Sequence, residues 1–286
     1  MKLRVTTRRD RELGTRPMDH TGGMWSALSP ERRGVLLAVL ALGTLAVLAI
    51  TVVLGRAQSE PTEVVQDDVG PVVLLSGYGG NVDALAPVVL TLQSQGRQVE
   101  VFPPVGDNTE DLREQAAQFE RYATDLMAAD DATSIDVVGY SAGGLVARLW
   151  VREHDGAAHA RRVVTLGSPH HGTGVSALAT EAGGCPRACE QMRPGSDLLR
   201  RLNADDETPP GPQWVTVRTQ VDRTVTPPES AELHGALNIS VQQLCPAATT
   251  SHGGLASSPA TLAVLTEVLG TQPPQAPAAD TVDCGS

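Results

Sequence analysis

The sequence predicts an α/β protein with a mostly parallel sheet, helices on both faces and a single transmembrane helix preceding it. From Pro71 onward, short apolar runs alternate with segments of helical spacing, which is typical of a parallel sheet covered on both faces. Before this region, residues 34–55 are 22 consecutive uncharged residues. A helix of that length spans roughly 30 Å, the thickness of the hydrocarbon layer of a membrane.

The composition excludes several other classes of protein. Hydrophobic residues make up 41% of the 286 residues and charged residues 19%, which argues against a disordered chain or a coiled coil. The net charge of −11 argues against non-specific binding to nucleic acid. No internal repeat of solenoid type is visible.

The charge distribution predicts how the chain is oriented across a membrane. Residues 1–33 carry eight basic and four acidic side chains, a net charge of +4, which leaves −15 for the remainder. Because basic flanks stay inside, 1–33 is expected to be a cytoplasmic tail and the C-terminal part to be extracellular, on a single-pass cell-membrane protein. The alternative is secretion after cleavage near Ala57, within a polar linker predicted over 56–70.

The first half of the expected domain alternates strands and helices. The run 71–77 is apolar, β-branched and closed by glycine, so it is predicted to be a buried strand. Apolar residues at helical spacing predict a helix from Ala84 to Gly96, and 98–102 is the next strand. Asn108 is expected to cap a helix that begins with an acidic turn and runs to about Ala129. A third strand is predicted over 134–140.

The second half continues the pattern with more irregular sequence. A helix is predicted over 145–154 and a strand over 161–168. Two later β-branched runs predict strands over 213–219 and 236–243, and a Ser-Pro start predicts a final helix over 258–270. The domain is therefore expected to cover 71–270, followed by a Pro/Ala-rich tail over 271–286.

Residues 172–212 form a long irregular stretch between two predicted strands. It holds a helix-like segment, 196–206, with Ser196 as its cap. This stretch is either a lid over a binding pocket or a plain strand-to-strand crossover with one helix, and the sequence leaves both open.

All four cysteines follow the predicted membrane span. An even number in an extracellular domain indicates disulfides, and of the three possible pairings Cys185–Cys189 and Cys245–Cys284 are favoured. A zinc site is disfavoured because the spacing lacks a C-x-x-C pair and suitably placed histidines, so no metal is expected.

The motif G-x-S-x-G at 139–143 directly follows a predicted strand and precedes a predicted helix. This is the strand–turn–helix context in which Ser141 becomes an exposed nucleophile. A serine nucleophile requires a base and an orienting acid, in the chain order Ser, Asp, His for this arrangement. Asp222 follows strand 213–219 and His252 follows strand 236–243, so both occupy the expected places.

Other titratable residues are expected to be structural or solvated. His170 and His171 break the required order and are expected to be structural or pocket-lining, and His234 is expected to be a surface histidine in a helical segment. Asp136, Asp205 and Asp206 likewise lack a catalytic position. Two backbone N–H groups should bind the oxyanion of the intermediate, those of Ala142 and Tyr78, the latter within the glycine-rich loop 76–80.

Together, the segments PVVLLSGYGG, VVGYSAGGLVARLWV, VVTLGSPHHGT, DRTVTPP and SHGGL resemble the α/β-hydrolase lipases of bacteria, in particular the small lipase class 2 type common in actinobacteria. The resemblance covers about 71–270 and implies hydrolysis of carboxylic, often lipid, esters without a cofactor. It places Ser141, Asp222 and His252 on the catalytic triad and Tyr78 and Ala142 on the oxyanion hole. One departure is Ser76, where the family usually has a histidine.

The expected function is thus that of a membrane-anchored extracellular serine hydrolase, a monomer whose substrate is an ester or lipid. Two alternatives stay open. An acyltransferase or thioesterase would use the same triad, and a surface binding module would have lost catalysis, which the departure at Ser76 motivates.

Overall fold

The computed structural model describes residues 29–57 and 64–285, which fall into two units, 1–60 and 61–286. In the first unit, α1 (Pro30–Ala57) contains the uncharged run 34–55. Within the described ranges, no helix meets the combined requirements of length and apolar character for crossing a membrane. The transmembrane helix predicted over 34–55 is therefore not confirmed.

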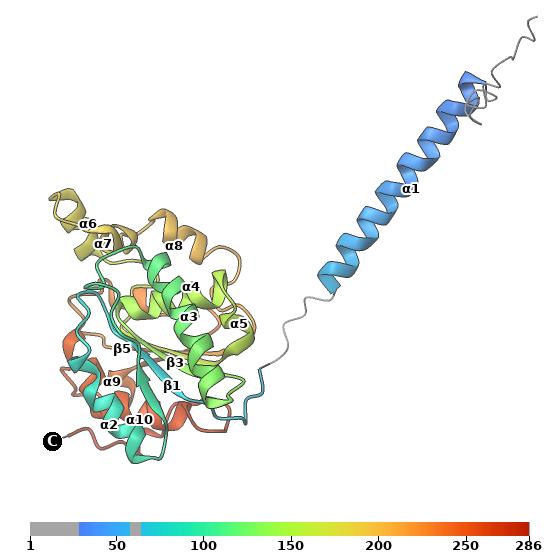
Figure 1. The fold of residues 1–286 in the computed structure, drawn as a ribbon. Helices are drawn as coiled ribbons and strands as arrows, with labels where there is room; N and C mark the ends of the chain where they lie inside the picture. Colours follow the sequence, from blue (N-terminus) through green and yellow to red (C-terminus); the bar gives the residue numbers. More distant parts are fainter. Residues whose placement is uncertain (1–28, 58–63, 286) are drawn as a thin grey trace, which may run out of the picture. The chain divides into compact units, whose positions relative to one another are not determined.

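The second unit is built on a six-stranded parallel sheet, which confirms the predicted α/β class (Figure 1). The strand order is β2-β1-β3-β4-β5-β6. The strands are β1 (Val72–Leu75), β2 (Val99–Val101), β3 (Ile135–Tyr140), β4 (Ala160–Leu166), β5 (Gln213–Arg218) and β6 (Leu237–Ser240). Because β2 and β3 lie on opposite sides of β1, the strand order reverses at β1, and ligand sites of open α/β sheets lie at the carboxyl ends of the strands at such a point.

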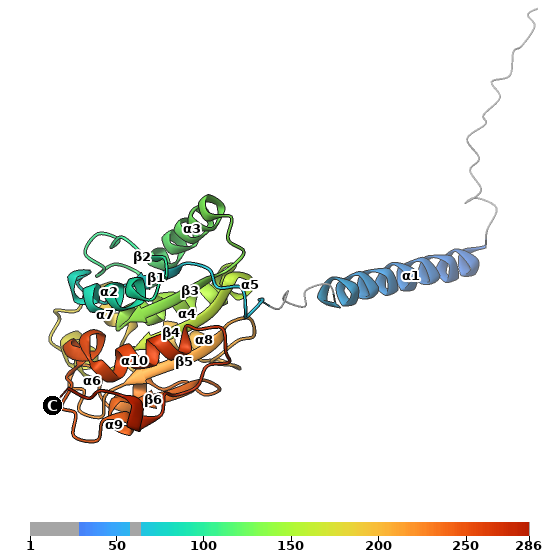
Figure 2. The same cartoon turned by 90° about the horizontal axis from the view of Figure 1, so that it is seen from below.

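Helices cover both faces of this sheet, as Figure 1 and Figure 2 show. One face carries α3 (Leu112–Asp130) and α4 (Ala142–Glu153), and the other carries α2 (Ala86–Ser94), α9 (Val241–Leu244) and α10 (Pro259–Val268). Alternate residues of each strand enter the two cores. In β1, for example, Val73 and Leu75 pack toward α3 and α4, whereas Val72 and Leu74 pack toward α2 and α10.

Two differences between predicted and observed bounds have a clear cause in local hydrogen bonds. The third long helix begins at Leu112 rather than at Asn108, because the Asp111 side chain accepts a hydrogen bond from the Arg113 N–H and caps it. The strand predicted over 236–243 ends at Ser240, where a capping box of Ser240 and Gln243 starts α9.

The stretch 172–212 connects the neighbouring parallel strands β4 and β5. It contains three short helices where one was expected: α6 (Gly174–Glu181), α7 (Arg187–Gln191) and α8 (Asp197–Leu202). The predicted cap is confirmed, since the Ser196 hydroxyl accepts a hydrogen bond from the Leu199 N–H. The short α5 (Gly156–His159) precedes β4.

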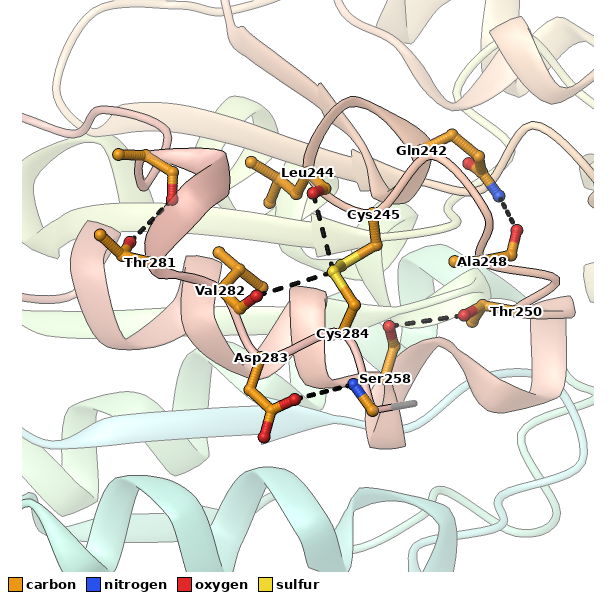
Figure 3. Close-up of a disulfide and its surroundings, with 12 residues drawn as sticks. Gln242, Leu244, Cys245, Ala248, Thr250, Ser258, Thr281, Val282, Asp283 and Cys284 are labelled. Atoms are coloured by element: carbon orange, nitrogen blue, oxygen red, sulfur yellow. Dashed lines mark hydrogen bonds between the residues drawn. A yellow bond between two sulfur atoms is a disulfide. The ribbon is translucent and has the colours of Figure 1, made fainter.

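Both favoured disulfides are present, Cys185–Cys189 and Cys245–Cys284. The second is drawn in Figure 3, where Cys284 reaches the residue that follows α9. The Pro/Ala-rich segment over 271–286 is thus covalently fastened to the second unit near its C-terminal end.

Candidate active site

Ser141 occupies a sharp turn between the last residue of β3 and the first residue of α4. Its backbone has φ 54° and ψ −123°, a conformation that non-glycine residues rarely adopt and that costs about 1–3 kcal/mol. The Ser141 N–H donates to the Leu166 carbonyl at the end of β4, over 2.8 Å. The strained turn therefore lies at the carboxyl edge of the sheet, where the sequence predicted it.

Glycines around the turn allow three backbone segments, those of β3, α4 and the end of β1, to come close together. A Cβ atom added to Gly139 would lie 2.5 Å from the Cα atom of Gly144, and one on Gly143 would lie 2.4 Å from the Leu75 carbonyl oxygen. Distances below about 3 Å are not tolerated when the neighbour is backbone, so only glycine fits at either position. The turn is consequently packed against the end of β1.

The structure brings the three predicted side chains together in one hydrogen-bonded row. The Ser141 Oγ lies 3.1 Å from the His252 Nε2, and the His252 Nδ1 lies 2.8 Å from the Asp222 Oδ2. Because the carboxylate can only accept, Nδ1 is assigned the ring proton and Nε2 is left to accept the serine proton. Asp222 lies in the loop after β5, and His252 follows β6 and α9. Both meet Ser141 at the edge of the sheet.

Asp222 is held as a carboxylate. Burial raises its pKa, but the hydrogen bond and charge of His252 and the backbone N–H groups of Val225 and Thr224 outweigh burial and leave the pKa below its ordinary value. The Thr224 and Val225 N–H groups donate to the Asp222 Oδ1 over 2.8 and 2.9 Å. The anion is thus available to orient the imidazole and to stabilise its cation.

The imidazole of His252 is fixed from two further sides. The Tyr140 hydroxyl donates to the His252 carbonyl over 3.1 Å, and the two rings lie 5.4 Å apart at 33°. A Cβ atom on Gly167 would lie 3.2 Å from the His252 Cε1 and Nδ1, so the backbone of the β4 loop covers that edge. Burial, followed by the charge of Asp222, raises the pKa of Tyr140, which keeps its hydroxyl a donor.

The loop proposed to bind the oxyanion lies directly beside the serine. A Cβ atom on Gly77 would be 2.9 Å from the Ser141 Cβ and 3.5 Å from its Oγ. Tyr78 follows Gly77 and lines the same cavity as Ser141, and Ala142 is the buried first residue of α4. The structure therefore places both predicted oxyanion residues next to the serine.

Asn108 is a site residue that the sequence analysis missed. Its buried amide donates to the Ser76 Oγ over 3.0 Å and to the Gly77 carbonyl over 3.3 Å, and it accepts from the Val105 N–H over 2.8 Å. Its own backbone is left-handed, with φ 57°. Asn108 thereby ties Ser76 into the loop. The signal was available: Asn108 follows β2, which pairs with β1, so both strands end at the same edge.

An apolar cavity of about 240 Å³ opens beside Ser141. Its lining comes from loops after the strands and from the crossover, and includes Pro169, Val175, Ala179, Met192 and Val225. Residues 173–192 thus contribute one wall. The same segment exposes apolar side chains, since Leu178 is 69% and Val175 46% accessible.

The remaining predicted residues lie away from the row or serve the fold. His170 is fully buried, its Nε2 lies 3.0 Å from the Thr165 Oγ1, and burial depresses its pKa well below the ordinary value. His171 pairs with Glu207 over 2.8 Å. His234 is exposed as expected but lies in a turn, not in a helix. Asp136 is buried, whereas Asp205 and Asp206 are exposed.

Comparison with known proteins places this geometry in a familiar fold. Residues 71–203, just under half of the chain, match the sequence model of the palmitoyl protein thioesterase family. A search of curated proteins finds no match.

Solved structures resemble the chain more broadly. Lipase B of Aspergillus fumigatus aligns with 76% of this chain at 17% identity and a TM-score of 0.67, and this chain spans 57% of its length. The mature lipase BlEst2 of Bacillus licheniformis aligns with 71% of this chain and 93% of its own length, at 17% identity and a TM-score of 0.59. The lin2722 product of Listeria innocua aligns with 68% of this chain and 91% of its own length, at 14% identity and a TM-score of 0.52. Together with the six-stranded parallel sheet, these likenesses support an α/β-hydrolase fold.

Proposed function

We propose that the protein is a serine hydrolase that cleaves carboxylic esters through an acyl-enzyme on Ser141. One observation carries the proposal: Ser141, His252 and Asp222 form an unbroken row of hydrogen bonds at the edge where ligands bind in α/β proteins. The α/β-hydrolase fold and its similarity to lipases support it.

The geometry suggests the following reaction. As the Ser141 Oγ attacks the ester carbonyl, the His252 Nε2 takes the hydroxyl proton, and the new C–O bond places a negative charge on the carbonyl oxygen. The N–H groups of Tyr78 and Ala142 are proposed to bind that oxygen. When the tetrahedral intermediate collapses, the bond to the alcohol oxygen breaks and His252 protonates the departing alcohol. Water, deprotonated by His252, then releases the acid and restores Ser141.

The proposal is tested by replacing Ser141 with alanine in the full chain. We expect hydrolysis of p-nitrophenyl esters to fall by at least about 10³-fold, with the thermal midpoint nearly unchanged, because alanine keeps the Cβ atom and the same backbone turn. Ser257→Ala, which alters an exposed serine near His252, is the matched control and should keep full activity. Equal turnover by Ser141→Ala and wild type contradicts the proposal, and no turnover by folded wild type favours a binding module.

The apolar cavity is the proposed acyl site, and residues 172–212 are the proposed lid over it. Its wall of Val175, Ala179 and Met192 suits an aliphatic chain, and the exposed Leu178 offers a contact to a lipid surface. A lid of this kind predicts higher activity on long, emulsified esters than on short, soluble ones. The opposite preference indicates an esterase with a fixed crossover.

Thioester hydrolysis is a second candidate, favoured by the match of residues 71–203 to the palmitoyl protein thioesterase family. The same serine and histidine serve both reactions, because only the leaving atom changes. Rates on an acyl thioester and an oxygen ester of equal chain length separate the two. Analysis of the products with added alcohols identifies the third possibility, an acyltransferase.

We further propose that the enzyme is tethered to the cell membrane through residues 34–55, with 1–33 cytoplasmic and the hydrolase extracellular. The uncharged run and the contrast between +4 and −15 support this arrangement. Membrane fractionation with protease treatment of intact cells tests it, and digestion of residues 71–270 is expected. Release of a form that starts near Ala57 into the medium indicates secretion.

A further inference from the structure

A second cavity lies on the histidine side of the triad. Its volume is about 480 Å³, and its lining includes Arg223, Thr224, Thr249, Ser251 and His252. Thr224 also lines the apolar cavity that holds Ser141, so the two cavities adjoin at that residue. The row of catalytic side chains therefore has one cavity against the serine and another against the histidine.

The proposed reaction assigns different parts of the substrate to the two cavities. The acyl chain is assigned to the apolar cavity, beside the Ser141 Oγ that forms the acyl-enzyme bond. The leaving group receives its proton from His252 and must lie against that residue as the bond breaks. His252 lines the second cavity and is absent from the described lining of the first. The second cavity is thus the place for the leaving group.

The charge of the second cavity is the opposite of the charge of the domain as a whole. Arg223 is the one charged residue among the described residues that line it apart from the catalytic histidine, and no carboxylate is among them. The neighbouring Asp222 is buried and bonded to His252. By contrast, the sequence after residue 33 carries a net charge of −15.

The Arg223 guanidinium is also free to bind a ligand; Arg193 and Arg201 are likewise exposed without a described partner, but they lie outside this cavity. Arg223 is exposed, and no described residue forms an ion pair or hydrogen bond with its guanidinium, whereas Arg187, Arg200 and Arg218 each pair with a carboxylate. Three hydroxyls, those of Thr224, Thr249 and Ser251, line the same space and can donate to an acceptor. A guanidinium with nearby hydroxyls is a typical set of donors for phosphate or carboxylate.

We propose that the natural leaving group carries an anion, a phosphate or a carboxylate, which pairs with Arg223. This inference rests on the proposed ester hydrolysis and adds the substrate class to it. A soluble alcohol or thiol that bears such a group and the phosphate of a glycerolipid share this chemistry, and the test separates them.

The test uses the full chain and two butyrate esters that differ only in charge, those of 4-hydroxybenzoate and 4-hydroxybenzamide. For each protein, kcat/KM on the anionic ester is divided by kcat/KM on the neutral ester. The measured quantity is this ratio in wild type divided by the ratio in Arg223→Gln. Intrinsic reactivity cancels in this double ratio. An exposed ion pair predicts a value of about three to five, which should fall in high salt.

Cleavage of the neutral ester measures any change in the triad itself, and the double ratio removes that change. Arg223→Lys should keep part of the preference, and Arg121→Gln, on the exposed side of α3, should keep all of it. A double ratio of one overturns the inference while leaving ester hydrolysis intact. If wild type cleaves neither ester, the proposed function fails, and the assignment of the leaving group fails with it.

A second arm compares phosphatidylglycerol vesicles with the soluble anionic ester. Dependence on Arg223 for both substrates indicates a lipid phosphate as a source of the anion. Dependence for the soluble ester alone indicates a soluble leaving group.

Discussion

Asn108 holds the loop beside Ser141 in place. Its amide links Ser76 and Gly77 of the glycine-rich loop 76–80 to the Val105 backbone, and Gly77 in turn packs against Ser141. Position 76 is a serine, and Asn108 supplies hydrogen bonding to its hydroxyl. We therefore expect Asn108 to act as a positioning residue that reaches the reaction only through the loop.

Replacing Asn108 with alanine is predicted to lower kcat by about tenfold to a hundredfold while KM changes little. The loss is smaller than or equal to that of an oxyanion donor, because the backbone N–H groups stay but their placement loosens. Steady-state kinetics on a p-nitrophenyl ester checks this. Asn238→Ala is the control, since that amide makes comparable bonds near β6. Should both variants lose stability and neither lose kcat, Asn108 is only structural.

At the scale of single residues, the triad could be predicted because each member follows a strand. Parallel strands carry their following residues to one edge, so Ser141, Asp222 and His252 were expected to meet despite more than a hundred residues between the first and the last. Asn108 also follows a strand, β2, but the sequence there predicts a helix cap instead. Its partner Ser76 lies 32 residues earlier, and the local acidic turn after Asn108 resembled the start of a helix.

Among the elements, α10 is fastened to the sheet by buried arginines. Arg161 and Arg162 of β4 donate to the carbonyls of Val268, Leu269 and Gly270, at the end of the helix where the dipole is negative. Their neighbour Asp136 of β3 is fully buried and pairs with Arg161 and Arg97. The one carboxylate thus compensates a buried cluster of guanidinium groups.

Asp136→Asn is predicted to lower the free energy of unfolding by about 3–5 kcal/mol, because it leaves buried arginines without their counter-charge. Denaturant unfolding of the full chain measures this change. Asp206→Asn, at an exposed carboxylate, should change stability by less than about 0.5 kcal/mol. A loss below about 1 kcal/mol in Asp136→Asn means that the carboxylate is not needed to balance the cluster.

At the element scale, strand-like and helix-like runs alternate regularly along the sequence. The bounds of β1 to β5 could therefore be predicted to within one or two residues. The crossover 172–212 was less so, because α6, α7 and α8 are each shorter than nine residues and show little periodicity. The end of β6 was mistaken for more strand since Val241 is β-branched. Only the capping box of Ser240 and Gln243 reveals the turn to helix.

For the molecule as a whole, the two disulfides act over different lengths of chain. Cys185–Cys189 spans a separation of 4 residues, and Cys245–Cys284 spans 39 and holds the C-terminal segment in place (Figure 3). In the chain-entropy description, the longer loop constrains the unfolded state more. This contrast gives each disulfide a matched control in the other.

Removing the long disulfide with Cys245→Ala and Cys284→Ala is expected to cost about 4 kcal/mol of unfolding free energy. Removing the short one with Cys185→Ala and Cys189→Ala is expected to cost about 2 kcal/mol. Equilibrium unfolding in urea compares the two variants. If the short disulfide proves the more stabilising, loop entropy does not govern the difference. Both pairings were favoured from position in the sequence, and the structure confirms them.

For the whole molecule, we propose that the fold presents Ser141 as an activated nucleophile. The most direct measurement is the reaction of the folded full chain with a fluorophosphonate, read by intact mass and peptide mapping. The account predicts one adduct per chain, located on Ser141, that forms far more slowly in His252→Ala. An unlabelled wild-type protein, or an adduct on another residue, would contradict it.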